Sequence, residues 1–92
     1  MSDKRAHIIV RGAVQGVGYR YFAYKHARAY NLKGYVKNLF DGSVEVVVEG
    51  NHSLIEELIK DLRRGPVSAH VTEVEVDWEI PSNEFSTFEI KL

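Results

Sequence analysis

The 92-residue sequence contains no cysteine and only two prolines. Without cysteine, the chain forms no disulfide, binds no metal through thiolates and has no cysteine nucleophile. The absence of cysteine is typical of a reducing compartment, and we expect a cytoplasmic protein. Few prolines together with 45% apolar residues exclude a disordered composition and predict a single folded domain over residues 1–92.

Long apolar runs are also missing. No stretch approaches the roughly 20 residues that a helix needs to span a bilayer. The first residues lead directly into a strand-like segment, without the apolar core of a signal peptide. We therefore expect neither a membrane anchor nor secretion.

Acidic residues are absent from most of the first half of the chain. Eight Lys or Arg residues and no acidic residue lie between Lys4 and Phe40, whereas residues 41–92 contain four basic and twelve acidic residues. A cationic half suits an anionic ligand. Mutual neutralisation of the two halves in the folded protein explains the pattern equally well. The net charge of −1 argues against a dedicated nucleic-acid-binding protein, so we predict no nucleic-acid partner.

The apolar periodicity predicts the order β-α-β-β-α-β followed by a short terminal strand. Asn31 is a plausible left-handed stop for the first helix, Asp41-Gly42 predicts a hairpin, and Ser53 with Glu56 predicts a capping box for the second helix. The predicted strands cover residues 7–11, 35–40, 44–49, 72–80 and 88–92, and the predicted helices cover residues 19–30 and 53–64. This order is typical of the ferredoxin-like α+β fold, an antiparallel sheet with two helices on one face.

The fourth predicted strand alternates apolar and acidic side chains. Strict alternation is typical of a sheet with one buried and one solvated face, so we interpret the acidic side chains as a solvated face and not as a carboxylate site. The inward residues of this strand are Thr72, Val74, Val76, Trp78 and Ile80, and the outward ones are Glu73, Glu75, Asp77 and Glu79.

A glycine-containing loop joins the first strand to the first helix and ends at Arg20. Helix N-termini expose unpaired amides, and glycines at Gly16 and Gly18 let successive amides converge on an anion. The guanidinium of Arg20 suits bidentate contact with phosphate oxygens. These parts indicate a phosphate site, although an ordinary turn with a solvated arginine has the same pattern. The loop has neither the Lys of a Walker motif nor the third glycine of a dinucleotide fingerprint.

Asn38 is the second polar residue of interest, because it lies near the end of the second predicted strand, just before the hairpin. Its side chain either bonds to the nearby backbone, as is common at turns, or positions a water beside a bound anion. The four histidines, His7, His26, His52 and His70, have no metal-ligand spacing, and we predict no metal site.

Two stretches resemble the signatures of the acylphosphatase family. The stretch Gly12–Arg20, with sequence GAVQGVGYR, is similar to the first signature, although Tyr19 stands where Phe is common. Gly34-Tyr35-Val36-Lys37-Asn38, followed after three residues by Gly42-Ser43-Val44 and then by Gly50, is similar to the second. The two stretches have the expected separation, and the resemblance runs from about Ala6 to Leu92.

The resemblance implies a monomeric enzyme that hydrolyses small acyl phosphates to a carboxylate and inorganic phosphate, with no metal or cofactor. It also implies the family's βαββαβ fold. By motif position, Arg20 corresponds to the phosphate-binding arginine and Asn38 to the water-orienting asparagine. The implied phosphate loop comprises Gln15, Gly16, Val17, Gly18, Tyr19 and Arg20.

Two other hypotheses about the function compete with the enzyme hypothesis. One is a noncatalytic ferredoxin-like module that binds RNA or a small metabolite. Lys33-Gly34-Tyr35 begins like an RNA-recognition strand, but Val36-Lys37-Asn38 departs from that motif. The other is an acylphosphatase-like domain that serves the carbamoyl-phosphate chemistry of a larger enzyme. The chain's length and termini favour a stand-alone protein over that domain.

Overall fold

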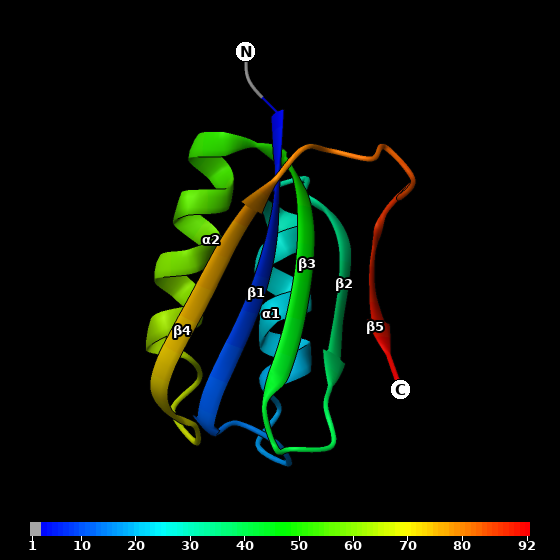
Figure 1. The fold of residues 1–92 in the computed structure, drawn as a ribbon. Coiled ribbons are helices and arrows are strands. Elements are labelled where there is room, and N and C mark those ends of the chain that lie inside the picture. Colours follow the sequence, from blue (N-terminus) through cyan, green and yellow to red (C-terminus); the bar gives the residue numbers. More distant parts are fainter. Residues whose placement is uncertain (1–2) are drawn as a thin grey trace.

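The computed structural model describes residues 3–92 as one five-stranded sheet with two helices on one face (Figure 1). The strand order across the sheet is β4-β1-β3-β2-β5. The elements in chain order are β1 (Asp3–Ala13), α1 (Tyr19–Ala29), β2 (Lys33–Asn38), β3 (Val44–Asn51), α2 (His52–Arg64), β4 (His70–Glu79) and β5 (Phe88–Lys91). The predicted ferredoxin-like α+β fold is confirmed.

The sheet is mixed, because the short terminal strand, whose direction the sequence left open, joins it parallel to its neighbour. β1, β2, β3 and β4 pair antiparallel, but β5 runs parallel to β2. The reason is the connection after β4: residues 80–87 cross the end of the sheet to its far edge, where the chain turns back alongside β2 (Figure 1).

Two predicted boundaries are wrong for local reasons. Leu39 and Phe40 belong to the turn and not to β2, because the Leu39 amide donates to the Ser43 carbonyl at 2.9 Å and closes the hairpin there. The second helix has no Ser53 capping box. Its N-cap is Asn51, whose Oδ1 accepts from the Leu54 amide at 3.1 Å.

The core lies between the sheet and the helices and contains the predicted inward residues of β3 and α2. On β4, an edge strand, the prediction holds only in part. Val74 and Val76 pack against the core, but Trp78 is 42% exposed at the sheet edge, and Ile80, which follows the end of the strand, is 88% exposed. Within residues 3–92, neither helix is long and apolar enough to cross a membrane.

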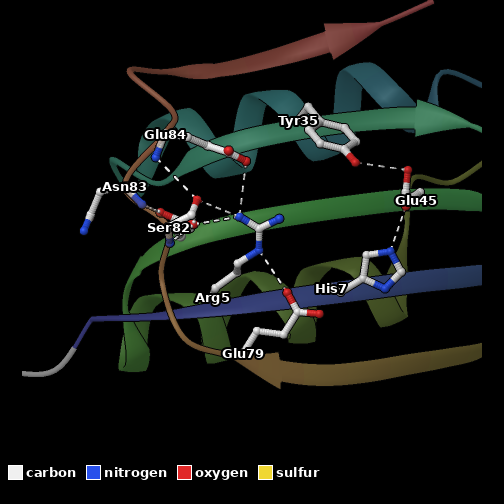
Figure 2. Close-up of polar contacts among 9 residues, drawn as sticks. Arg5, His7, Tyr35, Glu45, Glu79, Ser82, Asn83 and Glu84 are labelled. Atoms are coloured by element: carbon white, nitrogen blue, oxygen red, sulfur yellow. Dashed lines mark hydrogen bonds and ion pairs between the residues drawn. The ribbon is translucent and has the colours of Figure 1, made fainter.

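A polar cluster on the outer face of the sheet holds the crossing segment in place (Figure 2). Arg5 on β1 donates to Glu79 at 2.9 Å and to Glu49 at 2.9 Å. Glu49, only 6% exposed, also accepts from the Ser82 amide at 2.8 Å and from the Asn83 amide at 3.0 Å. Since residues 80–87 deliver β5 to the sheet edge, this cluster also determines where β5 lies.

Replacing Glu49 with glutamine is expected to reduce the free energy of unfolding at pH 7 by about 2–3 kcal/mol, because charge-assisted hydrogen bonds are lost. Burial opposes ionisation of Glu49, but hydrogen bonds from Ser82, Arg5 and Asn83 outweigh it and lower the pKa of the carboxyl. A lowered folded-state pKa stabilises the fold above the unfolded-state value of 4.5, and this stabilisation is lost as the pH falls through and below it. Urea unfolding of both proteins at pH 7 and pH 3.5 measures the effect. Equal differences at the two pH values would contradict it.

Candidate active site

The loop between β1 and α1 leaves the first amides of α1 free of any side-chain cap. The N-cap of α1 is Gly18, at φ 78°, and it makes no side-chain cap hydrogen bond. Gly16 also has a positive φ, of 76°. Both angles lie in the left-handed region, which glycine adopts without the steric cost that other residues bear. The first turn of α1 contains no acidic side chain. This helix N-terminus therefore presents unpaired amides and a partial positive charge.

Hydrophobic residues anchor the loop at both ends. Val14 and Tyr19 are buried, and the Tyr19 hydroxyl donates to the Leu62 carbonyl of α2 at 2.7 Å. Burial raises the pKa of Tyr19, which stays a neutral donor at physiological pH. Val17 packs against the core. The side chains of Tyr19 and Val17 thus fix the loop against the core.

Within residues 3–92, two arginines of the cationic half, Arg20 and Arg28, form no ion pair with a carboxylate, and of these two only Arg20 lines the cleft described below. Arg5 and Arg11 form ion pairs with carboxylates, whereas within residues 3–92 no carboxylate lies within 4.0 Å of Arg20. Its Nη1 donates to the Lys91 carbonyl of β5 at 3.1 Å. This contact orients the guanidinium without neutralising its charge.

Asn38 makes no hydrogen bond to the turn that follows it. Asp41 has that role, since its Oδ1 accepts from the Ser43 amide at 2.9 Å. The Asn38 Oδ1 is buried and has no hydrogen-bond partner among residues 3–92. A buried polar atom without a partner costs about 1–3 kcal/mol, so this oxygen does not stabilise the hairpin.

Gln15 connects the loop to the β2–β3 hairpin, a role that the sequence did not indicate. Its Nε2 donates to the Leu39 and Ser43 carbonyls, both at 2.8 Å. The side chain is occupied by these contacts. Because Leu39 follows Asn38 directly, the bridge also fixes the position of Asn38 relative to the loop.

A single cleft of about 230 Å³ brings most of the predicted site together. Of the predicted residues, Gln15 and Val17 do not line it. Sequence reasoning missed four lining residues, Val14, Tyr21, Ile90 and Leu92. The last two were missed because nothing in the chain indicated that β5 would lie beside the first turn of α1. The lining residues are Val14, Gly16, Gly18, Tyr19, Arg20, Tyr21, Asn38, Ile90 and Leu92.

A larger cavity of about 390 Å³ lies elsewhere, beside the polar cluster of the outer face. It contains none of the predicted site residues, and both Asp3 and Lys33 line it. Three of the four histidines each pair with one carboxylate, His7 with Glu45, His26 with Asp61 and His52 with Glu56. Among residues 3–92, no three His, Asp or Glu side chains gather as metal ligands would.

Comparison with known proteins shows the family of the chain. The model of the acylphosphatase family matches residues 6–90. The chain belongs to the acylphosphatase family. It is 50% identical over 91 residues to an acylphosphatase of Moorella thermoacetica, a match that covers 99% of this chain and 97% of that protein. The crystal structure of acylphosphatase from Bacillus subtilis matches with a TM-score of 0.93 at 34% identity, covering 97% of this chain and 99% of that one.

The same fold also occurs within a larger protein. The structure of T. kodakarensis HypF matches with a TM-score of 0.84 at 42% identity, but the match covers 97% of this chain and only 12% of the HypF chain. The chain is an acylphosphatase, an enzyme that hydrolyses acyl phosphates. Family membership therefore favours the enzyme over the noncatalytic binding module.

Proposed function

We propose that the cleft at the N-terminus of α1 is the active site and that residues 15–20 enclose the phosphoryl group of the substrate. Loop amides and the Arg20 guanidinium donate hydrogen bonds to the phosphoryl oxygens, and Asn38 holds the attacking water. The observation that carries the proposal is the charge of Arg20. It faces no carboxylate within residues 3–92, and it shares a cleft with uncapped helix amides and with Asn38.

The chemistry needs little beyond positioning and charge stabilisation. Water attacks the phosphorus, the bond between phosphorus and the acyl oxygen breaks, and its electron pair leaves on the carboxylate. A carboxylate is a good leaving group, so no strong acid is required. The proton of the water passes to a phosphoryl oxygen or to the leaving carboxylate. Fixed amides and Arg20 stabilise the negative charge on the equatorial oxygens.

Asn38 supplies the second part of the mechanism. A side-chain amide can hydrogen-bond one water, and Asn38 lines the same cleft as Arg20. Holding the water near the phosphorus replaces a random encounter with a fixed one. The Gln15 bridge to the Leu39 and Ser43 carbonyls keeps this amide at a constant position relative to the phosphate loop. All these groups come from one chain, so the proposed chemistry requires no second subunit.

Purified protein is expected to hydrolyse benzoyl phosphate at the same rate with and without a chelator, because Arg20 and the amides neutralise charge that a metal ion would otherwise neutralise. Ultraviolet absorbance follows the loss of benzoyl phosphate, with inorganic phosphate added as a competitive inhibitor. An Arg20→Ala preparation made in parallel controls for contaminating phosphatases. Activity that disappears with the chelator and returns with Mg²⁺ would contradict the proposed charge stabilisation.

A further inference from the structure

One wall of the proposed active-site cleft is apolar and exposed. Tyr21 on α1 and Ile90 on β5 both line it, and they are 59% and 37% exposed. Exposed apolar side chains are common singly, but here they converge on the cleft that contains Arg20. Neither Tyr21 nor Ile90 is needed to bind the phosphoryl group of the substrate, because the loop amides and the Arg20 guanidinium supply its hydrogen bonds.

The fold explains why Ile90 is uncovered. Phe88 and Ile90 lie two residues apart on β5 and so point to the same face of the sheet. Phe88 is buried in the core, whereas Ile90 lines the cleft beside the first turn of α1. The hydrogen bond from Arg20 to the Lys91 carbonyl holds this end of β5 against the helix start.

The charges around the cleft also indicate which acyl groups it disfavours. Within residues 3–92, Arg20 has the one charged side chain among the residues that line it. The ammonium of Lys91, which is close in sequence, lies 4.0 Å from the Tyr35 ring centroid and away from this lining. An acyl group that carries a carboxylate or a second phosphate would compete with the phosphoryl group for the single guanidinium.

We infer that Tyr21 and Ile90 form a subsite for the acyl part of the substrate, and that this subsite favours uncharged aromatic or branched apolar acyl groups over small or charged ones. The inference rests on the proposed function of the cleft, since the acyl group is covalently attached to the phosphoryl group held by Arg20. Contact with the aromatic ring and the branched side chain removes apolar surface of the acyl group from water. Acetyl and carbamoyl groups have too little such surface to gain comparably.

The test measures kcat/KM for benzoyl phosphate and for acetyl phosphate in the parent protein and in Ile90→Thr, Tyr21→Ser and the double variant. Threonine keeps the β-branched shape that suits a strand. Each single substitution is expected to lower the ratio of kcat/KM for benzoyl phosphate to kcat/KM for acetyl phosphate about fivefold. The effect is smaller than in an enclosed pocket because both side chains stay partly exposed to solvent. Ile80→Thr is the matched control, because Ile80 is an exposed isoleucine outside the cleft lining, and its ratio should stay at the parent value.

Two outcomes would overturn the inference while the proposed function stands. One is a parent-like ratio in the double variant. The other is an equal loss for both substrates together with weaker inhibition by inorganic phosphate, which would assign the two side chains to the phosphate site. A parent protein that hydrolyses neither substrate would instead refute the proposed function itself.

Discussion

Replacing Arg20 with alanine is expected to lower kcat/KM for benzoyl phosphate by about a thousandfold or more and to abolish competitive inhibition by inorganic phosphate. The magnitude follows from arginines that stabilise a phosphoryl transition state in other enzymes. Within residues 3–92, Arg20 is the one charged side chain that lines the cleft, so no neighbour replaces it. Steady-state kinetics with benzoyl phosphate and a phosphate inhibition series measure both effects.

The shape of the guanidinium contributes as well as its charge, so Arg20→Lys is expected to fail nearly as badly. A lysine ammonium is a point charge that cannot donate two parallel hydrogen bonds, nor reach the Lys91 carbonyl in the same orientation. Arg28→Ala is the matched control, since Arg28 is an exposed arginine on the same helix that contacts Tyr24. An Arg20→Ala variant with parent activity, beside an active control, would refute the site assignment.

Replacing Asn38 with alanine is expected to lower kcat by a factor of about 100–1000 while phosphate inhibition is largely kept. This corresponds to about 3–4 kcal/mol of transition-state stabilisation, as for the loss of one positioned oxyanion-hole donor. The split between turnover and phosphate affinity arises because Asn38 holds the water, whereas Arg20 and the loop amides hold the anion. Steady-state kinetics with benzoyl phosphate measure kcat, and a titration with inorganic phosphate measures the inhibition constant.

The stability of Asn38→Ala distinguishes this role from that of a turn residue. The Asn38 Oδ1 is buried without a partner, so its removal is expected to leave the free energy of unfolding unchanged or to raise it. Catalytic residues often lower the stability of the fold, so that replacing them raises the free energy of unfolding. If the variant instead unfolds more easily and turns over at the parent rate, Asn38 stabilises the hairpin and has no part in the chemistry.

The charge asymmetry of the sequence has two explanations, and each applies to different residues. Arg5 and Arg11 of the cationic half pair with Glu49, Glu79 and Glu75 of the acidic half, as mutual neutralisation requires. The acidic side chains of β4 are therefore exposed but partly paired across to β1. Arg20 alone of these three arginines faces the cleft, which fits an anionic ligand.

Much of the site was predictable because its signals are local. Positive φ angles at Gly16 and Gly18, the start of a helix at Tyr19 and the arginine on its first turn all depend on residues close together in the chain. The motif resemblance added Asn38, which no periodicity singles out. The Gln15 bridge was missed because a glutamine side chain carries no signal for which distant carbonyls it will meet.

By itself, the sequence determined the order of strands and helices, most of the core, the phosphate-loop motif and the family. Those features follow from side-chain alternation, helical spacing and glycine positions, all of which act over a few residues. Only the tertiary structure decided that β5 lies parallel to β2, that Ile90 meets the first turn of α1, and which arginines are neutralised. These outcomes depend on contacts between residues distant in the chain, set by how residues 80–87 cross the sheet, and no short-range pattern encodes them.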